Sequence, residues 1–176
     1  MFRCLCVFAL LVGGGIHALC AADERATALV LQNAAGKETT VSPPVWGKLP
    51  QKKMEAKDPH SGVTSVYEGV LLSDLVRAAG APLGEELRGP LLAGYVLAEA
   101  KDGYRVVYSI GEVDPDTGNA QILVANKKNG EPLSATEGPY RFVLPQDKRG
   151  ARWIRQVLRV SLHQLPAPAS AKPTKD

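Results

Sequence analysis

The amino-acid sequence predicts an α+β domain with mixed or antiparallel β sheets and two or three short helices. Between residues 26 and 165, short apolar segments alternate with turns rich in Gly, Pro, Asn and Asp, a pattern typical of about seven short strands. Only one segment, residues 71–79, shows clear helical spacing of its apolar side chains. The 176-residue chain is 45% hydrophobic, which is enough for one domain with a substantial core.

Strands are predicted wherever β-branched and apolar residues alternate between two turn signals. Asp102-Gly103 joins two of them as a hairpin, and Asn129-Gly130 reverses the chain further on. Residues 154–162 fit both the alternation of a strand and the spacing of a helix, and we favour a strand from Val157 onward with an irregular or helical entry. The other predicted strands are residues 27–32, 52–56, 63–67, 94–100, 104–109, 121–125 and 140–144.

Helices are predicted at three places. The clearest covers residues 71–79, where Gly80 supplies the stop. A shorter helix is expected after Ser42, a favoured N-cap, with Pro43 in its first turn, where a missing N–H has no cost. Residues 110–113 are long enough for a single helical turn.

The first 22 residues have the order of a secretory signal peptide. Arg3 supplies the positive charge, an apolar run covers residues 5–12, and small residues surround Ala21. The apolar run is too short to span a bilayer. We therefore expect a periplasmic or secreted protein with one domain over residues 26–165, a disordered Pro/Ala-rich tail over 166–176 and no membrane span after cleavage.

All three cysteines, at positions 4, 6 and 20, lie in this leader. The mature chain would then have no thiol, which excludes disulfides, thiolate nucleophiles and cysteine-ligated metals. Only His60 and His163 remain as histidines, so a multi-histidine metal site is excluded too, and no metal site is predicted. The balance of 21 basic against 18 acidic residues does not suggest a nucleic-acid partner.

The segment after the predicted strand 140–144 is the most suggestive for binding. It brings together three cations, a glycine and an aromatic ring: Lys148, Arg149, Gly150, Ala151, Arg152 and Trp153. Guanidinium groups and backbone N–H groups suit a phosphate or oxyanion, and a tryptophan can stack on a flat ring. The alternative is a solvated basic loop.

His60 and an acidic cluster are two further polar features of the sequence. His60 has acidic residues near it but lies in a turn rich in loop formers, so a surface histidine and a functional one both stay open. Glu112, Asp114 and Asp116 are interpreted as a solvated turn that caps a helix, because a calcium loop needs more oxygen ligands at closer spacing.

From about Leu49 to Leu162 the chain resembles the oxidoreductase molybdopterin-binding domain family, which has the sulfite oxidase-like fold. It is most similar to the short exported members of that family. The resemblance is carried by three pieces in the right order, residues 67–80 (YEGVLLSDLVRAAG), 94–109 (GYVLAEAKDGYRVVYS) and 147–153 (DKRGARW).

The resemblance implies a site for molybdopterin, whose dithiolene and a protein cysteine ligate molybdenum in larger members. It also implies that Gly150, Ala151 and Arg152 lie on the phosphate side of the cofactor. The chain departs from the family in having no ligand cysteine. In sulfite oxidases a short insert bearing a lysine follows this motif, whereas Trp153 follows at once here, and the dimerisation domain of the full enzymes is absent.

Three functions follow as hypotheses. The first is an exported module that binds a small anionic or pterin-type ligand, or a protein partner, without cysteine-ligated molybdenum. The second is a molybdopterin-dependent oxidoreductase in which oxygen replaces the thiolate, and the third is a protein-interaction scaffold. The candidate ligand-binding residues are His60, Tyr104, Tyr108, Lys148, Arg149, Gly150, Ala151, Arg152 and Trp153, and no catalytic residue is assigned.

Overall fold

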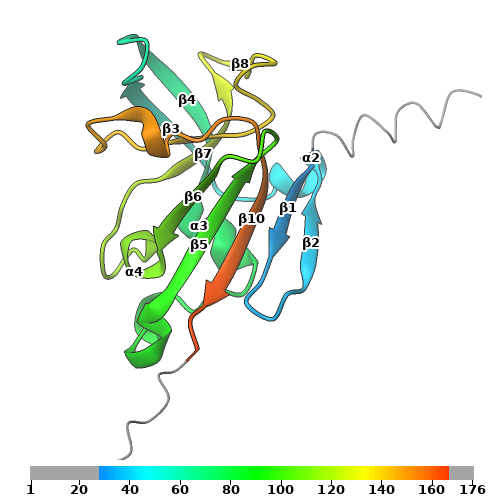
Figure 1. Cartoon of the computed structure of the whole chain (residues 1–176). Helices are drawn as coiled ribbons and strands as arrows, with labels where there is room; N and C mark the ends of the chain where they lie inside the picture. The colour runs from blue at the N-terminus through cyan, green and yellow to red at the C-terminus, as the bar shows by residue number, and fades with distance from the viewer. Residues whose placement is uncertain (1–27, 167–176) are drawn as a thin grey trace, which may run out of the picture.

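The computed structural model describes residues 28–166, which form two five-stranded sheets (Figure 1). Sheet A has the strand order β2-β1-β10-β5-β6. Sheet B has the order β3-β4-β7-β8, and β9 pairs with β7 beside this path. The predicted α+β class with mixed and antiparallel sheets is confirmed.

Sheet A joins the two ends of the described chain. Strand β10 lies between β1, which it pairs in parallel, and β5, which it pairs antiparallel. The β5–β6 hairpin turns at Gly103, whose positive φ of 85° suits glycine. The strands of sheet A are β1 (Leu29–Gln32), β2 (Glu38–Val41), β5 (Gly94–Ala100), β6 (Arg105–Ser109) and β10 (Val157–Gln164).

Sheet B is antiparallel throughout and forms the upper part of the molecule in Figure 1. The register between β4 and β7 shifts at Gly69. A Cβ at this glycine would lie 2.0 Å from the backbone oxygen of Val124, so only glycine fits there. The strands of sheet B are β3 (Gln51–Lys57), β4 (Thr64–Leu71), β7 (Leu123–Lys128), β8 (Glu131–Pro132) and β9 (Arg141–Val143).

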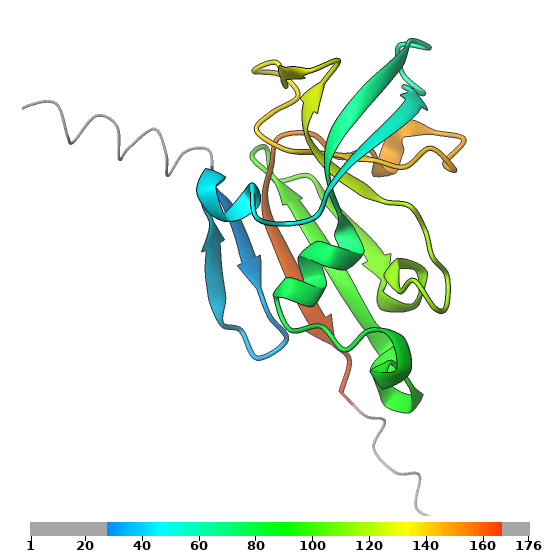
Figure 2. The same ribbon diagram turned by 180° about the vertical axis from the view of Figure 1, so that it is seen from behind.

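The helices are short, as predicted. Helix α3 covers one face of sheet A and lies in front of that sheet and below sheet B in Figure 2, and it buries Leu72, Leu75 and Val76. The α-helices are α2 (Pro43–Trp46), α3 (Leu72–Ala78) and α4 (Ile110–Val113), and the 3₁₀ turns are η1 (Gly84–Glu86), η2 (Gly89–Ala93) and η3 (Gly150–Arg152).

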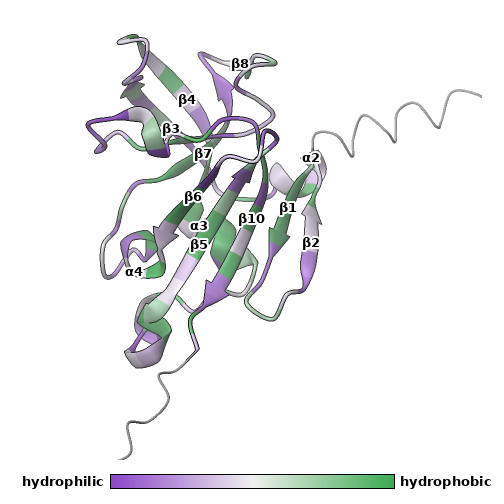
Figure 3. Ribbon diagram, viewed as in Figure 1, coloured by the Kyte–Doolittle hydropathy of each residue, from purple (hydrophilic) through white to green (hydrophobic). Residues whose placement is uncertain are grey.

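Both sheets and α3 contribute buried apolar side chains to one continuous core. The hydropathy of the strands alternates along their length (Figure 3), as expected for sheets with one buried face. Tyr108 and Phe142 are fully buried with ring centroids 5.3 Å apart, which joins β6 to β9. Each buried side chain of this size contributes roughly 1.5–3 kcal/mol of transfer free energy.

Most predicted elements are confirmed, including the hairpin, the three helices and the strand from Val157, whose entry over residues 154–156 is irregular. Strand β2 was missed. It follows a turn in which the Asn33 side chain accepts hydrogen bonds from the backbone N–H groups of Ala35 and Lys37. The N-cap expected of Ser42 makes no side-chain hydrogen bond, whereas Ser109 does cap α4.

The predicted signal peptide, residues 1–22, lies outside the described residues, as does the predicted tail apart from Pro166. Across residues 28–166, no helix combines the length and apolar character needed to cross a membrane.

Candidate functional site

A cavity of about 510 Å³ opens at the end of the molecule formed by sheet B. Three loops surround it: the β3–β4 turn, the loop before β9 and the segment that contains η3. We call it the Arg141 cavity. It is lined by Asp58, Pro59, His60, Ser61, Lys128, Ser134, Thr136, Glu137, Arg141, Gly150, Ala151, Trp153 and Arg155.

Arg141 is the central charged residue of this cavity and is only 3% exposed. Its Nη2 donates to Asp58 Oδ2 at 3.0 Å, and its Nη1 donates to Glu137 Oε1. The guanidinium carbon also lies 5.3 Å from the ring centroid of Tyr67 and 5.5 Å from that of Trp153. Two carboxylates and two rings therefore hold this buried cation in one orientation.

The carboxylate of Asp58 is kept ionised by the turn in which it lies. Burial opposes its ionisation, but hydrogen bonds from the backbone N–H groups of His60 and Ser61 and from Arg141 lower its pKa below the usual range. Glu137 also contacts Lys128, with Nζ and Oε1 3.4 Å apart. Two cations and two carboxylates therefore balance each other at the buried side of the cavity.

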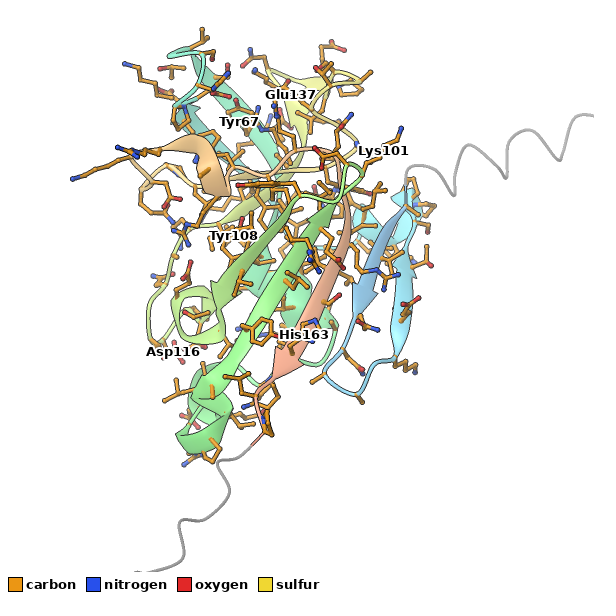
Figure 4. All side chains as sticks on the ribbon, viewed as in Figure 1. Tyr67, Lys101, Tyr108, Asp116, Glu137 and His163 are labelled. Atoms are coloured by element: carbon orange, nitrogen blue, oxygen red, sulfur yellow. The ribbon has the colours of Figure 1, made fainter. Side chains whose placement is uncertain are left out.

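Two polar atoms beside the cavity lack partners among the described residues. They are the Tyr67 hydroxyl and Arg141 Nε, both inaccessible to solvent. Figure 4 shows Tyr67 and Glu137 at the same end of the molecule, above Tyr108. Buried polar groups are nearly always hydrogen-bonded, so two unpaired polar atoms at one side of a cavity are unusual. This side of the cavity is polar and has hydrogen-bonding capacity left over.

The basic side chains at the mouth of the cavity differ in their environment from Arg141 at its base. His60 and Arg155 are exposed, and neither takes part in an ion pair among residues 28–166. The cavity therefore offers hydrogen-bond acceptors at its base and positive charge at its mouth.

The structure does not bring Arg152 into this cavity. Its guanidinium forms a bidentate pair with Asp147, at 2.9 and 2.7 Å, and a third hydrogen bond to Glu112 at 2.7 Å. The bonds to Asp147 raise the pKa of Arg152 far above its ordinary value. Arg152 thus ties the η3 segment to α4, and its charge is compensated within the protein.

Tyr104 and Tyr108 also support η3. The Tyr108 hydroxyl donates to the Arg152 carbonyl oxygen at 2.6 Å, and the Tyr104 hydroxyl donates to the Ala151 carbonyl oxygen at 2.9 Å. Burial raises the pKa of Tyr108 far above its usual value, so this hydroxyl stays protonated and remains a donor. Tyr108 is buried, whereas the Tyr104 ring is 50% exposed.

Of the residues predicted from the sequence, the structure brings four together at the Arg141 cavity: His60, Gly150, Ala151 and Trp153. Trp153 is also a core residue, since its ring is buried and its Nε1 donates to the Leu144 carbonyl oxygen at 3.0 Å. Lys148 and Arg149 are exposed on the same segment but do not line this cavity.

A second cavity, of about 290 Å³, is lined by residues of η3 and of the β5–β6 hairpin, and we call it the Tyr104 cavity. Both cavities are lined by Thr136, Gly150, Ala151, Trp153 and Arg155. Only the second is lined by Asp102, Tyr104 and Gln156.

Sequence reasoning missed the charged residues Asp58, Lys128, Glu137, Arg141 and Arg155. One signal was available for Arg141, which stands alone as a charge in the apolar strand predicted over residues 140–144. A charge in such a position is rarely buried without a partner. The identity of the partner was hidden, because Asp58 lies 83 positions away in the chain.

The chain belongs to the family described as the oxidoreductase molybdopterin binding domain, whose model matches residues 22–170. Among solved structures it is similar to the sulfane dehydrogenase SoxCD from Paracoccus pantotrophus, with a TM-score of 0.60 and 18% sequence identity. That match covers 80% of this chain and 39% of the other, so this chain spans less than half of that length. No match was found among curated proteins.

The family implies molybdopterin, whose fit can be tested against the residues that line the cavity. Residues 28–166 contain no cysteine, and they hold no cluster of three His, Cys, Asp or Glu side chains suited to a metal ion. The carboxylates of Asp58 and Glu137 are already bound to Arg141. Within residues 28–166 these side chains therefore do not fit thiolate-ligated molybdenum.

Proposed function

We propose that this protein is an exported module that binds a small anionic or pterin-type ligand in the Arg141 cavity, without cysteine-ligated molybdenum. The observation that carries the proposal is the buried Arg141, held by Asp58 and Glu137 at the base of a cavity of about 510 Å³. A fixed, desolvated ion-pair network beside a cavity is an arrangement typical of ligand sites.

The charge distribution supports a ligand with two chemical ends. Glu137 Oε2 has one hydrogen-bond partner within residues 28–166, the Ser134 hydroxyl at 3.4 Å, so it can accept a further hydrogen bond, and a pterin offers an amino group and a ring N–H as donors. At the mouth, Arg155 and His60 suit an anionic substituent such as a phosphate. Trp153 forms part of the wall between these ends.

The proposal includes export, which rests on the signal-peptide pattern of residues 1–22. Its test is direct: in a host that makes molybdopterin, the periplasmic fraction should contain the chain with its first residue near position 21 or 23. A chain that stays in the cytoplasm with an intact N-terminus contradicts this part of the proposal.

The ligand is tested by analysing the same purified protein for molybdenum and for released pterin. We expect pterin without stoichiometric molybdenum, or binding of added neopterin, a pterin that carries no phosphate, by calorimetry. Glu137→Gln should weaken neopterin binding, because it removes a charged acceptor, while exposed Glu55→Gln on β3 should not. Stoichiometric molybdenum with pterin supports an oxidoreductase instead, and a folded protein that binds neither contradicts the proposal.

A further inference from the structure

We propose that the Tyr104 cavity is a second subsite of the same binding site, and that it takes the aromatic ring of a phosphate ester whose phosphate lies at Arg155. This inference rests on the proposed function, because the second subsite extends the ligand that the Arg141 cavity holds. It makes the ligand class a heterocycle linked through phosphate to a second ring, as in a nucleotide-bearing molecule.

The two cavities are neighbours that share one wall. The shared residues are Thr136 from the loop before β9, Gly150 and Ala151 from η3, and Trp153 and Arg155 from the segment that leads into β10. A ligand that fills the Arg141 cavity therefore meets the Tyr104 cavity directly beside it. Their volumes, about 510 and 290 Å³, suit a larger and a smaller ligand part.

Tyr104 provides an exposed ring that is fixed in place. Its backbone N–H donates to Asp102 Oδ1 at 2.9 Å, and its hydroxyl donates to the Ala151 carbonyl oxygen at 2.9 Å. Yet the side chain is 50% exposed. An aromatic ring held by its own hydroxyl loses little conformational freedom when a second ring stacks on it.

Arg155 supplies the positive charge between the two cavities. It lines both of them, is exposed, and forms no ion pair within residues 28–166. Its neighbour Arg152 is different, because Asp147 and Glu112 already compensate its charge. A guanidinium without a carboxylate partner, beside an exposed ring, is suited to a phosphate ester of an aromatic heterocycle.

The backbone next to Arg155 is also specialised. Gln156 has a positive φ of 53°, which is uncommon for a residue other than glycine. Its N–H donates to the Glu137 carbonyl oxygen, and its carbonyl oxygen accepts from Lys101 N–H. Gln156 therefore joins the loop of the Arg141 cavity to the hairpin of the Tyr104 cavity and fixes their spacing.

The test uses GMP, ribose 5-phosphate and guanosine as probes, measured by calorimetry on the full chain purified after export. We expect GMP to bind about tenfold more tightly than ribose 5-phosphate or guanosine, because only GMP has both the ring and the phosphate. Tyr104→Ala should lower the affinity for GMP to that of the native protein for ribose 5-phosphate. Arg155→Ala should lower the affinity for GMP to that of the native protein for guanosine.

Two controls separate this site from general effects. Arg149→Ala removes an exposed cation of the same segment that lines neither cavity, and it should leave GMP affinity unchanged within twofold. Tyr104→Phe keeps the ring and should retain most of the binding. Equal affinities for GMP and ribose 5-phosphate, or equal losses in Arg149→Ala and Arg155→Ala, overturn the inference.

Neopterin distinguishes the failure of this inference from the failure of the proposed function. If neopterin binds while GMP shows no advantage over ribose 5-phosphate, the second subsite is refuted and the proposed function stands. If GMP binds through Tyr104 and Arg155 while neopterin does not bind, the pterin assignment is refuted and the phosphate-ester subsite stands. If no probe binds at millimolar concentration, both are refuted.

Discussion

Replacing Arg141 by leucine tests whether the ion-pair network at the base of the cavity is as buried as its geometry indicates. Arg141 is 3% exposed, and the side chains of Asp58 and Glu137 are 9% and 16% exposed. Arg141→Leu leaves both carboxylates close together without their shared cation. Removing one partner of a buried ion pair costs about 3–5 kcal/mol, because the remaining charge is uncompensated.

Other contributions change this value little. The substitution also removes the contacts of the guanidinium with the rings of Tyr67 and Trp153, each worth roughly 1 kcal/mol. The buried leucine regains a similar amount through its apolar surface. We therefore expect a loss of about 3–5 kcal/mol at pH 7, a large share of the roughly 5–15 kcal/mol that stabilises a typical domain.

The loss should depend on pH in a defined direction. In the native protein the pKa of Asp58 is lowered, so its carboxylate stabilises the fold above the unfolded pKa of about 3.9, and this contribution is lost as the pH falls through the folded pKa. Without Arg141, only the backbone hydrogen bonds from His60 and Ser61 oppose the effect of burial on Asp58, so we expect the pKa of its carboxyl group to rise. The stability deficit of Arg141→Leu should therefore shrink by about 1 kcal/mol or more between pH 7 and pH 4.5.

The assay is urea unfolding followed by the fluorescence of the buried tryptophans Trp46 and Trp153. Arg155→Leu is the matched control, because Arg155 lines the same cavity but is exposed, and it should change stability by about 0.5 kcal/mol or less. A deficit for Arg141→Leu below about 1 kcal/mol, or one that is equal at both pH values, refutes the reasoning.

Three further predictions concern the scaffold. Gly69→Ala places a Cβ 2.0 Å from a backbone oxygen of β7 and should cost about 3 kcal/mol or more or prevent folding, whereas Gly47→Ala, with no neighbour closer than 3.6 Å, should be nearly neutral in the same urea titration. For the fully buried Asp114, burial opposes ionisation, but hydrogen bonds from a backbone N–H and a threonine hydroxyl lower its pKa. Its carboxylate therefore stabilises the fold at pH values above the pKa of the unfolded state, and Asp114→Asn should be less stable than the native protein at pH 7. Because the variant has no carboxylate to protonate there, its free energy of unfolding should also fall less on acidification. Parallel plots of the free energy of unfolding against pH for the two proteins would contradict this. Arg152→Ala should destabilise by about 1–2 kcal/mol, since its ion pairs are partly solvent-exposed, and should leave GMP affinity within threefold; a selective loss of GMP binding at unchanged stability would restore Arg152 as a ligand residue.

The buried position of Asp114 corrects one interpretation made from the sequence. The sequence predicts a solvated turn at Glu112, Asp114 and Asp116, yet Asp114 is fully buried and accepts a hydrogen bond from the Gly84 backbone N–H at 2.6 Å. This bond joins α4 to a segment 30 positions earlier, so local sequence carries no signal of it.

Elements with local causes were predictable. The β5–β6 hairpin follows from Asp102-Gly103, and α3 follows from the spacing of its apolar residues before Gly80. Strand β2 was missed because it has only four residues, three of them exposed, and therefore shows no apolar alternation. Among the described strands it pairs only with β1. The parallel pairing of β1 with β10, from opposite ends of the domain, was equally hidden.

The sequence by itself determined the α+β class, the family and the importance of the segment that leads into β10, because periodicity, turn chemistry and ordered motifs are local or sequential properties. Tertiary structure decided which charges are available to a ligand. Arg152 is compensated by Glu112, 40 positions away, and Arg141 is held by Asp58, 83 positions away. The reason is physical: the fate of a charge depends on its burial and on its nearest opposite charge, and both are set by contacts between residues distant in the chain.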